Sequence, residues 1–155
     1  MKKICSLLVL TLIILTGCSG VIAESKKTYQ DYRDCWKTGD YKKCLDYWHP
    51  AILAEKSEMV EKTIQINKEE FGDLLNFERL DYIDERVIET WLYSGLVFHD
   101  VVELDITIRF PQVKDLPPRQ KKLVEIGPLV IREIAYVAKV NDQMKIIQIA
   151  GNDKR

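Results

Sequence analysis

The stretch from residue 96 to residue 110 has the most regular alternation of apolar and polar side chains in the chain. Successive side chains of a β-strand point to opposite faces, so this period of two predicts a long strand with one buried and one solvent-facing side. The predicted buried face carries Leu96, Phe98, Asp100, Val102, Leu104, Ile106, Ile108 and Phe110. Pro111 is expected to end the strand, because proline cannot donate to a ladder.

Further strands are expected on both sides of this one. They are residues 80–93 (one strand or a bulged pair), 123–140 (broken or bulged near Gly127) and 144–149. Ser94-Gly95 and residues 141–143 have the composition of hairpin turns. Residues 111–121 contain three prolines and four charges, which indicates an exposed loop.

The residues before this region follow a helical period instead. Two apolar stripes are separated by Gly39-Asp40, where glycine is typical of a helix end and aspartate of the next N-cap. The stripes are Tyr29, Tyr32, Cys35 and Trp36, then Tyr41, Cys44, Leu45 and Trp48. Residues 51–62 and 68–75, the latter capped by Asn67, predict two more helices. Helices followed by antiparallel strands predict an α+β domain.

The chain resembles the NTF2-like (cystatin-like) superfamily in two segments. The first reads Tyr29-x-x-Tyr32-x-x-x-Trp36-x-x-Gly39-Asp40-Tyr41-x-x-Cys44-x-x-x-Trp48-His49-Pro50, and the second is Met144-Lys145-Ile146-Ile147-Gln148-Ile149. The resemblance implies N-terminal helices packed on a curved antiparallel sheet, which together form a cone. Such cones often enclose an apolar pocket, and the superfamily contains enzymes, binding modules and exported lipoproteins.

The N-terminus resembles that of bacterial lipoproteins. Lys2 and Lys3 precede an apolar run from Ile4 to Leu15, which is shorter than the about 20 residues that a membrane-spanning helix needs. This arrangement is typical of a signal peptide, and Leu15-Thr16-Gly17-Cys18 resembles a lipobox. The resemblance implies cleavage before Cys18 and attachment of acyl chains such as palmitate to it. The alternative is an ordinary signal peptide with a cysteine near its end by chance.

These features divide the chain into a signal peptide (1–17), a tether (18–26), an α+β domain (27–150) and a frayed C-terminus (151–155). Two of the 23 basic residues precede Cys18 and all 24 acidic residues follow it, so the remaining chain has a net charge of −3. This charge argues against a nucleic-acid partner. The expected location is the cell envelope. Because Ser19 rather than aspartate follows Cys18, the resemblance favours the outer membrane, or the outward face of a single membrane.

Cys35 and Cys44 are the two cysteines that would remain free after cleavage and acylation. They are placed symmetrically about Gly39-Asp40, so two helices joined there would bring them face to face. A disulfide is expected in an oxidising compartment; the alternative is a pair of small buried side chains. Neither these cysteines nor His49 and His99 form a pattern that predicts a metal site.

Asp100 is the residue with the sharpest chemical hypothesis, because it falls on the predicted apolar face. A buried carboxylate is costly unless it is paired or lies in a wet cavity. In an NTF2-like pocket Asp100 would act as a general base, as in the ketosteroid isomerases, with Tyr82, Tyr93 or Tyr136 as a hydroxyl donor. The alternatives are a β-bulge at Asp100 or an ion pair with Arg132.

The sequence therefore leads to one principal interpretation and two alternatives. The principal one is a lipid-anchored, non-enzymatic module that uses no cofactor and binds a small apolar ligand or an envelope protein. Its candidate pocket residues are Trp36, Trp48, Phe98 and Asp100, although the helical aromatic residues could equally be core. The alternatives are a pocket enzyme that uses Asp100, and a structural subunit whose sheet is an interface.

Overall fold

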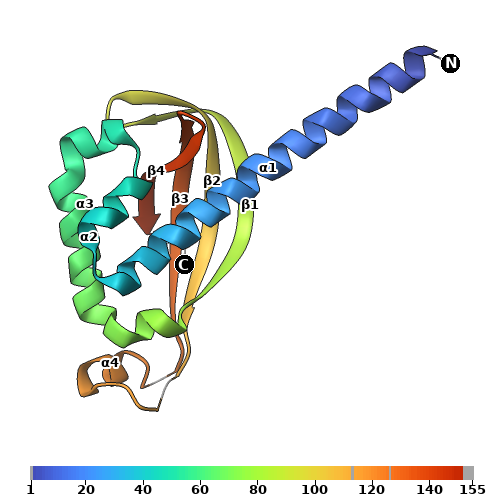
Figure 1. The fold of residues 1–155 in the computed structure, drawn as a ribbon. Helices are drawn as coiled ribbons and strands as arrows, with labels where there is room; N and C mark the ends of the chain where they lie inside the picture. Colours follow the sequence, from blue (N-terminus) through green and yellow to red (C-terminus); the bar gives the residue numbers. More distant parts are fainter. Residues whose placement is uncertain (1, 113, 126, 152–155) are drawn as a thin grey trace.

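The computed structural model describes the backbone of residues 2–112, 114–125 and 127–151, and the side chains of this set from Gly20 onward. Helices come first in the chain and a four-stranded antiparallel sheet follows. The helices lie on one face of the sheet, which curves around them (Figure 1). This arrangement confirms the predicted α+β class.

The strands follow one another in space as they do along the chain, in the order β1-β2-β3-β4. Their bounds are β1 Arg79–Tyr93, β2 Leu96–Phe110, β3 Leu129–Val140 and β4 Gln143–Gly151. The strand predicted from residues 96–110 is thus confirmed at both ends. The third strand begins at Leu129, later than predicted, after the expected break near Gly127, and residues Pro118–Leu123 form a short helix, α4.

Tight turns and bulges shape the sheet. Ser94 and Gly95 have φ angles of 53° and 75°, and Asn141 and Asp142 have 47° and 60°. Consecutive positive φ angles are typical of the two-residue hairpin turns whose twist matches that of the strands. The register shifts at Ile83 of β1, between the pairs of Tyr82 and Asp84 with β2, and at Ile147 of β4, between the pairs of Tyr136 and Val137 with that strand. Such bulges increase the local twist and bend of a sheet.

Two long helices and three short helical segments precede the sheet. Their bounds are α1 Lys2–Thr38, α2 Tyr41–Cys44, η1 Leu45–Tyr47, α3 Pro50–Phe71 and η2 Gly72–Phe77. Gly39 has a φ of 75° after α1, and the Asp40 side chain accepts a hydrogen bond from the Lys43 backbone at 3.1 Å, so the predicted helix end and N-cap are confirmed.

The two helices predicted at 51–62 and 68–75 are one helix, α3, as far as Phe71. Asn67, which the sequence marked as a new N-cap, instead donates its side-chain amide to the backbone oxygen of Thr63 at 2.8 Å. Helix α3 begins at Pro50, after His49 accepts a hydrogen bond from the Ala51 backbone at 3.2 Å. It ends at Phe71, and Gly72, the residue after it, has a φ of 48°.

Helix α1 includes the segment expected to be a tether. Residues 18–26 are helical, Val21 and Ile22 pack against the core, and Ser25 is fully buried. The Tyr82 hydroxyl also donates to the Lys26 backbone oxygen at 3.0 Å. The folded body therefore begins before residue 27. At the other end Gly151 belongs to β4, and residues 152–155 lie outside the described residues.

The main core lies between the helices and the inner face of the sheet. Even-numbered residues of β2 supply its centre, and Leu104, Ile106, Ile108 and Phe110 are fully buried. Phe110 stacks on Phe71 of α3 with ring centroids 5.2 Å apart. Among the described residues, no helix has the length and apolar character needed to cross a membrane.

Candidate functional site

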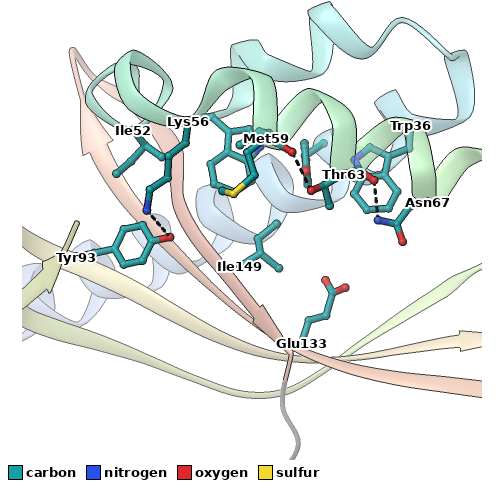
Figure 2. Close-up of a pocket in the computed structure, with 12 residues that line it drawn as sticks. Trp36, Ile52, Lys56, Met59, Thr63, Asn67, Tyr93, Glu133 and Ile149 are labelled. Carbon is teal, nitrogen blue, oxygen red and sulfur yellow. Dashed lines mark hydrogen bonds between the residues drawn. The ribbon is translucent and has the colours of Figure 1, made fainter.

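A cavity of about 170 Å³ lies between the helices and the inner face of the sheet. Helices α1 and α3 supply most of its wall, and Figure 2 shows Glu133 and Ile149 rising toward it from the strands. The residues that line it are Tyr32, Trp36, Trp48, Ile52, Lys56, Met59, Val60, Thr63, Asn67, Tyr93, Glu133 and Ile149.

One face of α3 forms a continuous side of the cavity. Lining residues recur along it every three or four positions, as residues on one helix face must. They run from buried Ile52, past half-buried Lys56, to Met59 and Thr63, which are exposed. The exposed pair lies where the cavity opens to solvent, and the apolar residues lie at its inner end.

Three aromatic side chains, Tyr32, Trp36 and Trp48, also line the cavity. Tyr32 packs edge-on against Trp36 and Trp48, with ring centroids 5.5 Å and 5.9 Å away. All three residues are at least nine-tenths buried. The Nε1–H groups of both tryptophans are buried and have no hydrogen-bond partner among the described residues. The protein encloses both nitrogen atoms, and both lie beside the Tyr32 hydroxyl.

The Tyr32 hydroxyl belongs to the same cluster. Burial raises the pKa of Tyr32 to about 12, and the neighbouring indole N–H groups of Trp48 and Trp36 oppose this rise without forming a hydrogen bond of good geometry. Tyr32 is consequently a neutral phenol at physiological pH. We refer to the polar hydrogens of Tyr32, Trp36 and Trp48 as the donor cluster.

Two charged side chains of opposite sign also line the cavity, and they lie well apart in Figure 2. Glu133 of β3 accepts a hydrogen bond from the Tyr29 hydroxyl at 2.6 Å. Burial raises the pKa of Tyr29 well above its usual value, and the charge of Glu133 adds to this, so Tyr29 remains a donor. Lys56 lies over the Tyr93 ring, 4.4 Å from its centroid, and contacts the Tyr93 hydroxyl at 3.3 Å.

The predicted pocket residues separate into two groups. Trp36 and Trp48 line the cavity, as the sequence predicted. Phe98 is buried but packs edge-on against His49, with centroids 5.2 Å apart, and does not line the cavity. His49 has a lowered pKa because of its burial.

Asp100 is exposed, and the prediction that it faces an apolar pocket is wrong. Its φ is 51°, a left-handed conformation that interrupts the alternation of β2. Val101 and Val102 are both fully buried immediately after it. The register with β1 is the same on both sides of Asp100, with His99 opposite Thr90 and Val101 opposite Ile88, so no register shift with β1 accompanies this conformation.

The tyrosines considered as partners of Asp100 lie elsewhere. Tyr82 donates to α1, and Tyr136 stacks on Trp91 with ring centroids 4.2 Å apart. Tyr93 alone of the three lines the cavity. No described contact supports general-base chemistry at Asp100.

Substitution of Asp100 tests its backbone role. We expect Asp100→Val to lower the free energy of unfolding by about 1–3 kcal/mol, because a β-branched residue is strained at positive φ. Asp100→Asn, which tolerates that conformation, should change it by less than about 0.5 kcal/mol. Urea titration of each variant measures the difference. Equal losses in both variants would mean that the carboxylate, rather than the backbone, matters.

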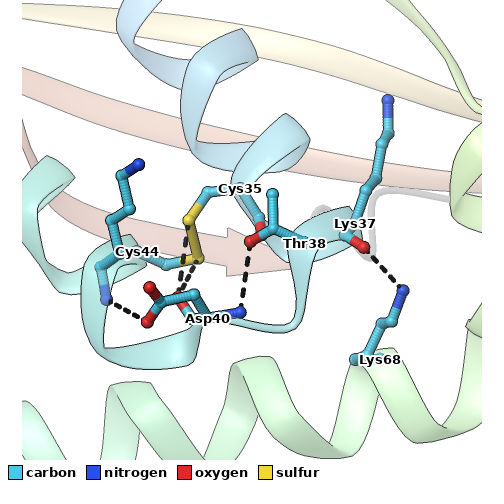
Figure 3. The surroundings of a disulfide bond; sticks show 7 residues. Cys35, Lys37, Thr38, Asp40, Cys44 and Lys68 are labelled. Atoms are coloured by element: carbon cyan, nitrogen blue, oxygen red, sulfur yellow. Dashed lines mark hydrogen bonds between the residues drawn. A yellow bond between two sulfur atoms is a disulfide. The ribbon is translucent and has the colours of Figure 1, made fainter.

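The Cys35–Cys44 disulfide is present and joins the end of α1 to α2. The two Cα atoms are 5.6 Å apart, within the range that a disulfide requires. Both sulfur atoms contact the backbone oxygen of Asp40, at 3.7 Å for Cys35 and 3.3 Å for Cys44 (Figure 3). The bond thus encloses the Gly39-Asp40 turn and holds Trp36 and Trp48 on segments that flank it.

The remaining predicted sites concern lipids and metals. Cys18 lies in the helical backbone of α1, and its side chain is outside the described residues. Within residues 20–112, 114–125 and 127–151, no three His, Cys, Asp or Glu side chains form a group that could hold a metal ion.

Sequence reasoning missed Lys56 and Glu133. Glu133 lies in the third strand, two positions before buried Ala135. Residues two apart in a strand share a face, so both lie on the inner face of β3. That alternation was available in the sequence. Because a break was expected near Gly127, however, it was not clear which residues of this strand would face the core. Lys56 lies on the same helical stripe as Ile52 and Val60, which could have identified it.

Comparisons with known proteins leave the family open. No protein-family model matches the chain, and no curated protein matches it. A similar solved structure is the solution structure of a SEC-C motif containing protein from Rhodopseudomonas palustris, at 11% sequence identity and a TM-score of 0.46. The alignment covers 85% of this chain and 81% of that one.

Proposed function

We propose that this protein is a lipid-anchored component of a bacterial cell envelope that binds a small, largely apolar molecule in the cavity between α1, α3 and the sheet. The observation that carries the proposal is the cavity itself, whose wall combines apolar side chains with a few polar groups. A cavity with apolar walls and a few convergent polar groups is typical of a ligand site.

The size of the cavity limits the ligand. Its volume is about 170 Å³, and an apolar protein cavity of about 150 Å³ is large enough to bind benzene. A ligand of about one six-membered ring with a short substituent therefore fits. A sterol or a complete acyl chain would need the cavity to enlarge.

The proposed fold is an NTF2-like cone. Its support is the resemblance of residues 29–50 and 144–149 to that superfamily, together with the curvature of the sheet around α1 and α3 (Figure 1). The proposed anchor rests on the lipobox-like Leu15-Thr16-Gly17-Cys18. Several acyl chains would make such an anchor durable, because each buried methylene adds about 0.8 kcal/mol.

Binding can be tested with fluorine NMR, because the chain has only three tryptophans. We would label the full protein with 5-fluorotryptophan in lipid nanodiscs and titrate toluene. The resonances of Trp36 and Trp48 are expected to shift, whereas that of Trp91, whose N–H is bound by Gln148 at 3.3 Å, should remain in place. Assignment follows from Trp→Phe variants.

A variant that blocks the opening provides the matched control. Thr63→Phe places a ring where the cavity meets solvent and should abolish the saturable shifts, whereas Thr90→Phe, at an exposed position that does not line the cavity, should preserve them. If toluene moves all three resonances alike, or moves none, the proposed binding function is wrong.

Anchoring is tested separately from binding. The full chain expressed in a bacterium with an alkyne-labelled fatty acid should become labelled and sediment with membranes. Cys18→Ser should lose the label and leave the membrane fraction, whereas Cys35→Ala should retain both properties. A Cys18→Ser variant that still carries label would contradict the proposed anchor.

A further inference from the structure

We infer that the ligand is a neutral molecule of about one ring that carries a hydroxyl group and donates its hydrogen to Glu133. This inference rests on the proposed binding function and adds the chemical class of the ligand. Three observations support it. Glu133 lines the cavity with a carboxylate oxygen that lacks a partner among the described residues, the neighbouring charges disfavour an ionic ligand, and the cavity holds about 170 Å³.

Glu133 brings a hydrogen-bond acceptor into the cavity. It belongs to β3 and is half-buried, and Figure 2 shows its carboxylate pointing from the strand toward α3. Its oxygen Oε2 accepts the hydrogen bond from the Tyr29 hydroxyl at 2.6 Å, whereas Oε1 has no partner among the residues that the structure describes. Unlike the indole nitrogens of Trp36 and Trp48, Oε1 is not fully enclosed by protein atoms, so a molecule in the cavity can reach it.

Positive charge already accompanies the carboxylates on this side of the cavity. Arg33 and Glu133 attract each other, and this attraction helps to raise the pKa of Arg33 above its ordinary value. Arg33 also pairs with Glu78 at 2.7 Å. Lys37 lies 4.0 Å from the other oxygen of Glu78, although it contacts the exposed Asp34 more closely, at 2.5 Å. Glu133 therefore does not require a cationic ligand.

An ionic ligand of either sign would meet a repulsive group. A cation bound to Glu133 would lie near Arg33, and Lys56 lines the same cavity. An anion would be repelled by Glu133 itself. Lys56 would offset this repulsion poorly, because it is already engaged with the ring and the hydroxyl of Tyr93. Moving a charge from water into a largely apolar cavity is also costly unless an opposite charge pairs with it.

A hydroxyl group avoids these costs and complements the unpartnered oxygen of Glu133. A carboxylate accepts hydrogen bonds but cannot donate them, and hydrogen bonds to a charged oxygen are about twice as strong as those between neutral groups. A carbonyl or an ether would present a second acceptor to it, and an alkyl amine would be protonated at neutral pH, as lysine is. The apolar remainder of the ligand can contact Ile52, Val60 and Ile149.

The test compares small aromatic molecules with the fluorotryptophan-labelled full protein in nanodiscs. Phenol carries a hydroxyl, toluene has a methyl group in its place, and in anisole a methyl group replaces the hydroxyl hydrogen. After correction for partition into the lipid, which Thr63→Phe measures, we expect phenol to bind about fivefold more tightly than toluene or anisole. Benzylamine, a cation at pH 7, and benzoate, an anion, should both bind more weakly than phenol.

Glu133→Gln tests the carboxylate directly. The glutamine oxygen can still accept from Tyr29, which leaves the amide nitrogen, a donor, on the side of the cavity. The preference for phenol over toluene should therefore fall to about twofold or less. Glu89→Gln, at an exposed position that does not line the cavity, should keep the full preference. If Glu133→Gln does not fold, the comparison of phenol with anisole in the unmodified protein decides.

The outcomes separate the hydroxyl inference from the binding function. Binding of phenol no tighter than that of toluene or anisole would overturn the inference and leave the binding function standing. Tighter binding of benzylamine or benzoate would also overturn it, because the site would then select a charge. A preference for phenol that survives Glu133→Gln would overturn the role of Glu133. Saturable binding of none of the five molecules would overturn the proposed function itself.

Discussion

Glu78→Gln is expected to lower the free energy of unfolding by about 3–5 kcal/mol, the usual effect of removing one partner of a buried ion pair. Arg33 Nη2 lies 2.7 Å from Glu78 Oε2, and the two side chains are only 3% and 1% exposed. Glutamine keeps the shape of the side chain but removes the carboxylate that contacts the guanidinium in the core.

The arginine cannot escape this cost by losing its proton. Burial alone would lower the pKa of Arg33, but its neighbours Tyr29, Glu78 and Glu133 raise it above its ordinary value. The guanidinium also lies 4.0 Å from the centroid of the Trp36 ring. Loss of the ion pair is therefore expected to disturb the donor cluster as well as the stability.

The measurement is a urea titration of both proteins, with the exposed ion pair between Asp81 and Arg109 as the control. Those side chains are 49% and 52% exposed, and exposed pairs contribute about 0–1 kcal/mol. Asp81→Asn should thus have a small effect. Similar losses from Glu78→Gln and Asp81→Asn would contradict the assignment of Arg33 and Glu78 as a buried, energetically important pair.

Removal of the Cys35–Cys44 disulfide is expected to lower the free energy of unfolding by about 3 kcal/mol. The cysteines are nine positions apart, and closing a loop of about ten residues restricts the unfolded chain by roughly that amount. The loss arises mainly in the unfolded state, so the folded positions of Trp36 and Trp48 should change little.

A pair of experiments separates the bond from the side chains. The unmodified protein is unfolded in urea with and without dithiothreitol, and the double variant Cys35→Ala, Cys44→Ala is treated in the same way. Dithiothreitol should destabilise the first and leave the second unchanged. A protein whose unfolding midpoint does not respond to dithiothreitol would contradict a stabilising disulfide.

The sequence predicted the strands well because alternate residues of a half-buried strand face the core and the solvent, so apolar and polar residues alternate along it. Leu104, Ile106, Ile108 and Phe110 alternate in the sequence and are fully buried in the structure. The same reasoning failed at Asp100. The sequence position continues the alternation of inner and outer side chains, but the backbone there has a φ of 51°. The pattern of apolar and polar residues along a strand does not show where a single residue adopts a positive φ angle.

Helix boundaries were less predictable than strands. Asn67 is an acceptable cap, yet its side chain bonds back to Thr63 and α3 continues. Three prolines indicated a loop where Pro118 is the first residue of α4, a position that proline favours. In both places the residue is compatible with two structures, and contacts with distant parts of the chain decide between them.

The lining residues of the cavity could be predicted only where they belong to a stripe of aromatic residues at helical spacing. Trp36 and Trp48 follow from the spacing of aromatic residues on the first helices. Glu133 enters the cavity because β3 is registered so that Ala135 lies opposite Leu104, a pairing between distant segments. The sequence contains both strands but does not state which residues of each become neighbours.

The continuity of α1 determines how ligands would reach the protein. From Gly20 to Tyr32 the helix rises about 18 Å at about 1.5 Å per residue. With Cys18 acylated as proposed, a continuous helix rather than a flexible linker would connect the lipid anchor to the domain that contains the cavity. Its occupancy would then follow the concentration of ligand dissolved in a thin layer of water beside the bilayer, and molecules held within the lipid would first have to leave it.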